Sequence, residues 1–389
     1  MESNISGVAD LRVTGRYISQ PTGYRAFIPE PLSNAPDINI DAELQTLLSN
    51  ADRALGRLDG SIQTLPNPDL FVFMYVRKEA VLSSQIEGTQ ASINDVLEAE
   101  AKILDPARPN DVSEVLNYVD AMNYGLKRLD SLPLSLRLFC EIHAKLMQNV
   151  RGGKLTPGEF RTSQNWIGPE GATLNEASFV PPPPSMLQDL LGDLEKFCHA
   201  DTALPALIKI GLIHAQFETI HPFLDGNGRV GRLLVTFLLC QQRILQLPVL
   251  YLSHYLKKHR ARYYDLLQAT RESGDWEGWL KFFLRGIAEV SAEATSTARR
   301  IVKLRETHRT VITEKFGRTA GNGLSILEYL FVNPIITVNQ VAKRLKVGYP
   351  TANDLMARFV AADILVETTG NARNRRFSYQ PYIRLFNDA

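Results

Sequence analysis

The sequence has few of the features that mark secreted, zinc-scaffold or membrane-spanning proteins. Only three of its 389 residues are cysteines, Cys140, Cys198 and Cys240, and no two of them form a C-x-x-C pair. This number and spacing argue against a disulfide framework and a zinc ribbon, so a reducing, cytoplasmic compartment is expected. No apolar run approaches the about 20 residues of a membrane span, and residues 1–10 lack the apolar core of a secretory signal, so we expect no membrane contact.

The chain also lacks an excess of charge of either sign. Lys and Arg number 43 and Asp and Glu number 42, a formal net charge of +1, which gives no reason to expect a polyanionic partner for the whole chain. The length favours two or three domains. Residues 317–389 differ from the remainder, because they carry nine Lys and Arg against five Asp and Glu.

Helical periodicity covers most of the chain. Apolar residues recur at three- and four-residue intervals from Asp41, a plausible N-cap, and a second helix over about 69–87 should end at Gly88. Residues 1 to about 40 are rich in proline and aromatics and predict an extended arm on the surface. Residues 151–184 are rich in glycine and end in Pro181–Pro184, which predicts a loop that carries a β-hairpin.

The last 70 residues predict a small domain of a different kind. Helical stretches near 322–332, 337–346 and 350–362 precede an alternating segment over 364–379. Three helices followed by a hairpin are typical of a winged helix-turn-helix, which could bind DNA or another protein.

The segment from His221 to Arg232 reads H-P-F-L-D-G-N-G-R-V-G-R. His-Pro should end one helix, and Asp-Gly-Asn-Gly should form a tight turn before another. A glycine-rich turn at a helix N-terminus is an anion site, because the unpaired N–H groups and the helix dipole both favour negative charge.

The polar residues around this turn suggest phosphate chemistry. Arg229 and Arg232 lie three residues apart on one helix and could share a polyphosphate. Asp225 is an oxygen ligand of the kind that magnesium prefers. His221 is a base that can accept a proton near neutral pH. Together they predict phosphoryl or nucleotidyl transfer, whereas taken singly they would be a structural histidine and a solvated helix face.

The same segment resembles the Fic family motif H-P-F-x-[D/E]-G-N-G-R-x-x-R at every defined position. The run from Phe160 to Val180 resembles the flap hairpin of that family, which clamps the target. Tyr263 and Tyr264 are similar to its adenine-side contact. The stretch from Ser83 to Gly88, S-S-Q-I-E-G, is similar to the inhibitory motif [S/T]-x-x-x-E-[G/N], in the position of members whose inhibitory helix precedes the core.

The resemblance implies a mainly α protein with a Fic-type helical core, a β-hairpin flap and a small C-terminal winged helix-turn-helix domain. The expected domains are an N-terminal arm with the inhibitory helices over 1–105, a catalytic core over 106–310 with the flap at about 158–182, and the winged helix over 317–389. A homodimer fits the family.

The resemblance also implies an activity, the transfer of AMP from ATP to a Ser, Thr or Tyr hydroxyl of a target protein and of the enzyme itself. His221 would act as base and Asp225 would bind Mg²⁺. The further implied roles are phosphate binding by Gly226, Asn227, Gly228, Arg229 and Arg232, adenine contact by Tyr263, anchoring by Phe223, target clamping by Ile167, Gly168, Phe179 and Val180, and autoinhibition by Ser83, Glu87 and Gly88.

Other functions remain open at this point. The chain could be a DNA-binding regulator in which the Fic portion senses a nucleotide. It could also remove AMP from a modified protein, since in related hydrolytic members the inhibitory glutamate positions water, and some members transfer other phosphate-containing groups. His214, seven residues before His221, is expected to be a packing residue.

Overall fold

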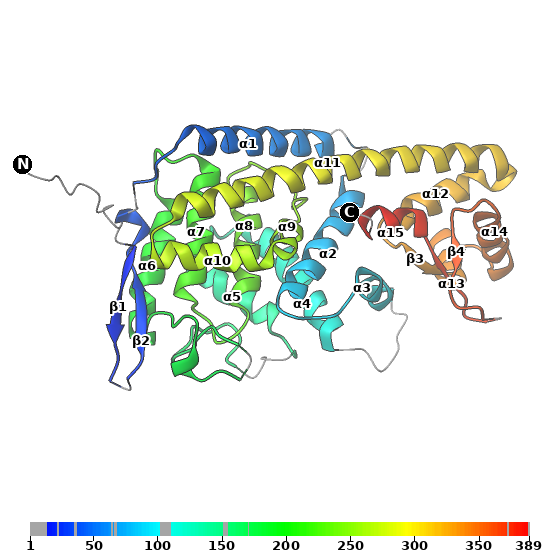
Figure 1. Cartoon of the computed structure of the whole chain (residues 1–389). Coiled ribbons are helices and arrows are strands. Elements are labelled where there is room, and N and C mark those ends of the chain that lie inside the picture. Colours follow the sequence, from blue (N-terminus) through cyan, green and yellow to red (C-terminus); the bar gives the residue numbers. More distant parts are fainter. Residues whose placement is uncertain are drawn as a thin grey trace, which may run out of the picture. The chain divides into compact units, whose positions relative to one another are not determined.

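The structure is a computed structural model that describes residues 14–387 except residues 22, 35–36, 64, 66–67, 102–109, 151–154, 170 and 372. The fold class is mainly α, as predicted (Figure 1). The α-helices of the described residues are α1 Ala42–Gln63, α2 Asp69–Ile86, α3 Ile93–Glu100, α4 Asn110–Leu129, α5 Leu136–Leu146, α6 Leu187–His199, α7 Ala206–Ile220, α8 Asn227–Gln241, α9 Ser253–Lys258, α10 Arg260–Glu272, α11 Trp276–Lys315, α12 Ala320–Leu330, α13 Val338–Leu345, α14 Tyr349–Ala361 and α15 Gln380–Asn387. The strands are β1 Gly15–Ser19, β2 Arg25–Pro29, β3 Ile335–Thr337, β4 Val366–Glu367 and β5 Arg376–Ser378.

Contacts divide the chain into two compact units. The first contains the described residues up to 54 together with 117–244 and 252–289, and the second contains 55–116, 245–251 and the described residues from 290 on. The helices α1, α4 and α11 therefore contribute residues to both. The predicted boundary at residue 105 lies outside the described residues, and the predicted domains remain a prediction.

The first unit is built around α7. Fourteen of its fifteen residues are buried, as expected of a helix surrounded by others, and α8 packs along it. Gly211 lets α11 approach closely, because a Cβ at this position would lie 2.8 Å from Leu280 Cδ2. The Trp279 indole N–H then donates to the Gly211 carbonyl at 2.9 Å. This packing fixes the helix that carries the motif histidine at its C-terminal end.

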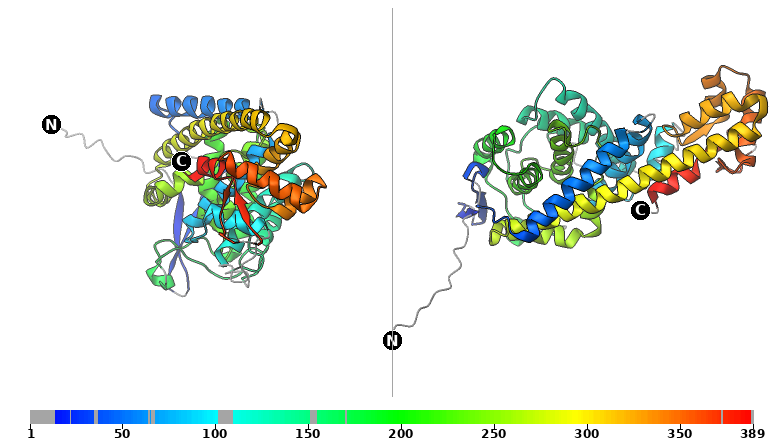
Figure 2. Two further views of the ribbon diagram at one scale, coloured as in Figure 1. Left: turned by 90° about the vertical axis from the view of Figure 1, so that its right-hand side faces the viewer. Right: turned by 90° about the horizontal axis from the view of Figure 1, so that it is seen from above.

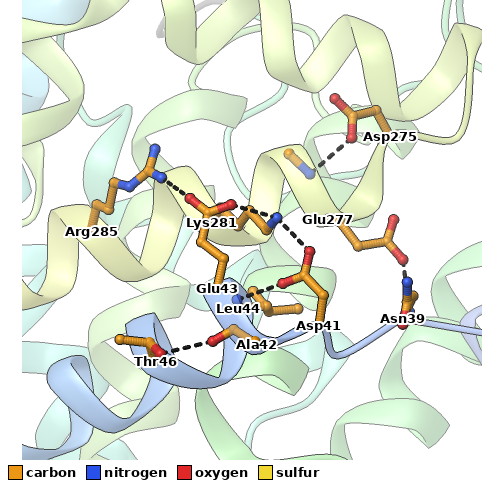
Figure 3. Close-up of polar contacts among 11 residues, drawn as sticks. Asn39, Asp41, Ala42, Glu43, Leu44, Thr46, Asp275, Glu277, Lys281 and Arg285 are labelled. Carbon is orange, nitrogen blue, oxygen red and sulfur yellow. Dashed lines mark hydrogen bonds and ion pairs between the residues drawn. The ribbon is translucent and has the colours of Figure 1, made fainter.

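The first turns of α1 lie beside the first turns of α11 (Figure 2). Asp41 caps α1, since its Oδ1 accepts from the Leu44 N–H at 2.7 Å, so the predicted N-cap is confirmed. Its other oxygen accepts from Lys281 Nζ at 2.7 Å, and Lys281 also reaches Glu43 (Figure 3). Glu43 pairs with Arg285 as well. One aspartate thus starts α1 and ties it to α11.

The N-terminal arm differs from the prediction. β1 and β2 form an antiparallel hairpin in which Tyr17 lies opposite Phe27 (Figure 1). Ala26, Phe27 and Ile28 of β2 are at most 5% exposed, so the second strand belongs to the core of the unit, whereas β1 stays largely at the surface. The prolines of the segment misled the prediction, because proline is also tolerated at strand ends and edges. Residues 1–13 of the predicted arm lie outside the described residues.

The second unit contains α2, α3 and the C-terminal module, which we define as residues 317–387. In the module α12, α13 and α14 accompany a three-stranded antiparallel sheet of order β3-β5-β4, and α15 follows. The helices agree with the predicted ranges within two residues. The predicted hairpin corresponds to β4 and β5, and β3 adds a strand that the sequence pattern did not indicate. That this module functions as a winged helix remains a prediction.

The double role of Asp41 can be tested by comparing two substitutions. Asp41→Asn keeps an oxygen that caps α1 and loses the charge that attracts Lys281, whereas Asp41→Ala loses both. We expect the melting temperature to fall in the order wild type, Asp41→Asn, Asp41→Ala, measured by calorimetry. The exposed Asp37 provides the control, and Asp37→Ala should leave the melting temperature unchanged. Equal effects of the two Asp41 variants would contradict the contribution of the ion pair.

Candidate active site

The motif occupies the connection from α7 to α8. His221 is the C-cap of α7, and its backbone is left-handed, with φ 51° and ψ 60°. A left-handed histidine is uncommon and shows that the surrounding structure determines this conformation. Gly226, with φ 80°, is the N-cap of α8. A Cβ on Gly226 would lie 2.9 Å from Met147 Sδ, so both the dihedral angle and the available space require glycine. The predicted helix stop, turn and helix start are therefore present.

Asn227 holds the turn together from inside. Its Nδ2 donates to the Phe223 carbonyl at 2.7 Å, and its Oδ1 accepts from the Phe223 N–H at 2.8 Å. Asn227 is 2% exposed and Phe223 is fully buried, in line with the anchoring expected of Phe223. Since the amide of Asn227 is bonded to Phe223 in this way, its side chain is held inside the turn, and its backbone N–H lies in the first turn of α8.

His143, which sequence reasoning missed, supports the turn from α5. Its ring stacks on Phe223 at 3.8 Å with an angle of 7° between the planes. Nδ1 accepts from the Gly158 N–H at 2.9 Å, so the proton lies on Nε2, which donates to the Asp225 carbonyl at 3.0 Å. Burial lowers the pKa of His143 to about 4, and the ring is neutral at pH 7. Its signal in the sequence is weak, because it stands 78 residues before the motif.

Arg161 and Asn165 connect the carbonyls of the motif to the flap segment. The Arg161 guanidinium donates from Nε to the His221 carbonyl at 2.9 Å and from Nη2 to the Pro182 carbonyl at 2.6 Å. Asn165 Nδ2 donates to the Phe223 carbonyl at 2.8 Å. Arg161 is 2% exposed, and burial lowers its pKa to about 10. These two residues fix the backbone on both sides of His221, and sequence reasoning did not single them out.

The flap has less regular structure than the predicted hairpin. Ile167 and Phe179 form one antiparallel bridge, with N–H to carbonyl distances of 2.9 and 3.1 Å, and no strand is assigned on either side of it among the described residues. Gly168 is exposed, while Phe179 and Val180 are buried. The Phe27 N–H of β2 donates to the Val180 carbonyl at 3.0 Å. The N-terminal hairpin, which was not predicted, is thus hydrogen-bonded to the flap.

A buried arginine closes the other side of the flap. Arg271 lies 3.9 Å from the centre of the Phe179 ring, and its Nε donates to Thr219 Oγ1 at 3.1 Å. Burial lowers the pKa of Arg271 to about 10, while the charge of Glu218 acts in the opposite direction. The last turn of α7 and the flap are thereby joined through one guanidinium.

The N-terminus of α8 carries the groups predicted to meet phosphate. The first intrahelical bond of α8 runs from the Val230 N–H to the Gly226 carbonyl, so the N–H groups of its first turn have no carbonyl of the helix to bond. Arg229 and Arg232 are both 3% exposed, so neither is a solvated side chain. The Asp225 side chain is 41% exposed; its Oδ1 accepts from the Gly226 N–H at 2.6 Å and lies 3.6 Å from Arg229 Nη2. Positive potential and an accessible carboxylate meet here.

The two tyrosines after the motif helix have different environments. Tyr263 is 1% exposed, and its hydroxyl donates to His214 Nε2 at 2.9 Å. The adenine contact of Tyr263 remains a prediction. Tyr264 is 41% exposed, with the guanidinium carbon of Arg260 at 5.7 Å from its ring centre. Tyr264 is therefore the better candidate of the pair for stacking on a base.

The residues predicted to be inhibitory lie in the second unit, at the end of α2. Ser83 is fully buried, Glu87 is exposed at the C-cap, and Gly88 adopts φ 100° as expected of a helix-ending glycine. The Glu87 N–H donates to the Ser84 carbonyl at 3.0 Å. The carboxylate thus stands at a helix end, where the dipole disfavours it.

The described residues contain no group of three or more His, Cys, Asp or Glu that could hold a metal ion. Within the same part of the chain, no helix is long and apolar enough to cross a bilayer. Asp225 as a magnesium ligand remains a prediction; a single carboxylate is compatible with it, because this ion usually binds through one or two carboxylates together with substrate phosphates and water.

The fold and site together define a helical protein with an anion-binding helix N-terminus beside a histidine. The model of the Fic/DOC family N-terminal region matches residues 45–127, and the model of the Fic/DOC family matches residues 133–239, which contain the whole motif. The chain therefore contains a Fic/DOC family N-terminal region over residues 45–127 and a Fic/DOC family region over residues 133–239.

Among curated proteins, the chain is similar to protein adenylyltransferase Fic of Aedes aegypti, with 31% identity over 204 residues, 51% of this chain and 37% of the relative. The protein of the same name in Drosophila virilis is 30% identical over 203 residues, 51% of this chain and 38% of the relative. The chain thus spans little more than a third of the length of these relatives.

Two solved structures share the fold. A Fic family protein from Desulfovibrio desulfuricans G20 has a TM-score of 0.58 and 19% identity, and the match covers 88% of this chain and 98% of that chain. A Fic domain containing signaling protein from Bacteroides thetaiotaomicron has a TM-score of 0.50 and 17% identity, covering 67% and 97%. At these identities the likeness supports the fold alone.

The His214 environment gives a direct test of the core behind the motif. Nδ1 lies 2.9 Å from the Gly231 carbonyl and must carry the proton, while Nε2 accepts from Tyr263. Burial lowers the pKa of His214 to about 4. We expect the unfolded chain to bind a proton below about pH 6.5 while the folded ring stays neutral, so this ring lowers stability as pH falls from about 6.5 to 4.

Nitrogen-15 NMR of the imidazoles measures this directly. The His214 ring should remain the neutral Nδ1–H tautomer until the pH approaches its lowered pKa of about 4. A His214 ring that gains its proton near pH 6.5 would show that the assigned hydrogen bonds are wrong.

Proposed function

We propose that the chain is a protein adenylyltransferase that transfers AMP from ATP to a Ser, Thr or Tyr hydroxyl of a target protein and of itself. The observation that carries the proposal is the turn over residues 222–226, which separates His221 from the N-terminus of α8. A base at one end of the turn and an anion site at the other can bring a hydroxyl and a phosphate together. The names of the curated relatives support the same reaction.

The geometry of His221 suits a base. Its Nδ1 lies 3.3 Å from the Glu218 carbonyl, which can only accept, so the proton belongs on Nδ1 and the lone pair on Nε2. In the proposed step, His221 Nε2 takes the proton of the target hydroxyl while the hydroxyl oxygen forms a bond to the α-phosphorus of ATP. The bond from that phosphorus to the bridging oxygen breaks, and pyrophosphate leaves.

The phosphates of ATP have a matching set of groups. The first-turn N–H groups of α8, at Asn227 and Gly228, would bind the α- and β-phosphates, and Arg229 and Arg232 would bind the distal ones. Mg²⁺, held by Asp225 and the phosphates, would neutralise part of their charge when bound. The partial exposure of Asp225 fits this role, since a carboxylate sealed in the core could not reach a nucleotide.

Glu87 is proposed as the residue that restrains the activity. Its carboxylate would pair with Arg232 and occupy the position of the γ-phosphate, so that ATP could bind only in a pose unfit for in-line attack. The placement of Glu87 against the preference of the helix dipole supports a cation partner. A homodimer and DNA binding by the C-terminal module remain secondary proposals.

Labelled ATP tests the reaction and its base together. With ATP labelled on the α-phosphate the protein should label itself, and with the γ-phosphate labelled it should not. We expect His221→Ala to lower the rate at least about 100-fold, because a positioned base contributes that much or more. ATP affinity, measured by calorimetry, should stay nearly unchanged.

The matched control is His199→Ala, which removes an exposed histidine outside the motif and should keep the wild-type rate. Label retained only from the γ position would identify a kinase instead. A protein that releases AMP from a modified target, and adds none, would favour the hydrolase.

Removal of the Glu87 carboxylate should raise the activity. A charge-assisted contact is worth about 1.5–3 kcal/mol, which corresponds to a rise of about 10- to 150-fold in self-modification for Glu87→Gly. Glycine suits the helix end, and Glu87→Gln tests the charge at nearly constant size. The control Glu98→Gln alters an exposed glutamate of α3 and should leave the rate unchanged. A Glu87→Gly protein no faster than wild type would contradict autoinhibition.

A further inference from the structure

The helix that ends in Glu87 is attached to the C-terminal module through an aromatic contact. Tyr75 of α2 is 1% exposed, and its ring meets the ring of Phe386 in α15 edge-on, with centres 5.4 Å apart at 83°. The Tyr75 hydroxyl also donates to the Ala294 carbonyl of α11 at 2.7 Å. Phe386 in turn meets Tyr382 at 5.6 Å, so α15 reaches α2 with a continuous aromatic surface.

A buried ion pair reinforces this contact one helical turn further along α2. Lys78 Nζ lies 3.2 Å from Glu293 Oε1 and 4.3 Å from the centre of the Tyr251 ring. The Tyr251 hydroxyl donates to the same Glu293 oxygen at 3.0 Å. The Lys78 side chain is 5% exposed, so breaking the pair would leave a charge in the core. The register of α2 against α11 is therefore strongly specified.

The opposite side of α2 meets α3 and is less completely filled. Arg77 forms two hydrogen bonds of 2.6 Å with the carboxylate of Glu100. Beside this pair lies a cavity of about 120 Å³, lined by Phe73, Arg77, Leu97, Glu100, Ala101 and residues 332–335 of the module. The cavity beside α3 leaves α2 room to shift once the contact between Tyr75 and Phe386 on its other, closely packed side is released.

The length of α2 can carry such a shift to the inhibitory motif. The helix is continuous from Asp69 to Ile86, and its sequence contains neither glycine nor proline. Glu87 follows Tyr75 by twelve residues and Lys78 by nine, which is about 18 and 14 Å at the usual helical rise. A change in direction near Tyr75 therefore displaces the C-cap.

We propose that Tyr75, Lys78 and Phe386 are positioning residues for Glu87, so that the docked C-terminal module sets the strength of autoinhibition. This inference rests on the proposed function for its activity readout and on the structure alone for its conformational readout. The module holds α15 against α2 and thereby keeps the Glu87 carboxylate in the position in which it inhibits the enzyme. Release of α15 from α2 weakens this inhibition.

The test uses the full chain with two variants that act on two different contacts of the Tyr75 side chain. Phe386→Ala removes the ring that meets Tyr75, and Tyr75→Phe removes only the hydroxyl that bonds Ala294. Self-modification with α-labelled ATP should rise about 2- to 30-fold for Phe386→Ala, the range found for residues that tune coupling without touching a ligand. Hydrogen exchange of residues 80–88, followed by mass spectrometry, should become faster in both variants.

The control for a general loss of stability is Phe359→Ala. Phe359 is fully buried in α14, and its ring meets Phe316 at 5.1 Å. It should leave the activity and the exchange of residues 80–88 at wild-type values, measured well below the melting temperature. In a Glu87→Gly background, Phe386→Ala should give no further rise, because the carboxylate that it repositions is gone.

The outcomes separate the two proposals. An inactive Glu87→Gly protein contradicts the proposed function, and the exchange measurement then decides the positioning proposal by itself. An active Glu87→Gly protein, combined with wild-type rates and wild-type exchange in Phe386→Ala and Tyr75→Phe, overturns the positioning proposal. A rise that persists undiminished in the Glu87→Gly background overturns it too, because the effect would then bypass Glu87.

Discussion

The candidate site depends on side-chain hydrogen bonds to the backbone carbonyl groups of the turn between α7 and α8. A left-handed histidine, a buried phenylalanine and a positive-φ glycine leave this backbone without the regular bonds of a helix. Arg161, Asn165 and Asn227 supply donors to the carbonyls of His221 and Phe223. Buried carbonyls without partners would each cost about 1–3 kcal/mol, so the turn could not hold this shape without the three side chains.

The same constraint explains why two histidines near the site are poor candidates for catalysis. His143 and His214 each accept one hydrogen bond and donate another, which fixes a neutral tautomer inside the fold. Burial lowers the pKa of each to about 4. His221 differs because it stands at a helix end, is partly exposed, and lies beside the anion site. Three histidines of one unit thus divide into two supports and one proposed base.

The flap and the N-terminal hairpin are joined to each other and together would support a target segment that approaches His221. The Phe27 N–H donates to the Val180 carbonyl, and the centre of the Phe27 ring lies 6.1 Å from the centre of the Phe179 ring. The guanidinium of Arg271 also packs on the Phe179 ring. In the second unit, α2 would have a comparable double role, since its buried face packs on α15 and α11 while its last residues carry the proposed inhibitory motif. In both places a functional segment takes its position from residues distant in the sequence.

The sequence by itself determined the elements whose causes are local. Periodic apolar residues specified the helices, Asp41 and Gly88 marked two of their ends, and twelve consecutive residues identified the Fic motif. Such features depend on hydrogen bonds and dihedral preferences within a few residues, which are legible in order along the chain.

Only the tertiary structure decided that Arg161 and His143 support the motif, that Tyr263 is buried while Tyr264 is exposed, and that residues 15–29 form a hairpin whose second strand is buried. The roles of Arg161, His143 and Tyr263 depend on hydrogen-bond partners more than forty residues away in the sequence. The hairpin is local, but its prolines suggested an extended strap instead of two paired strands. No local pattern encodes such a partner, because any carbonyl that the fold brings within about 3 Å can accept the bond.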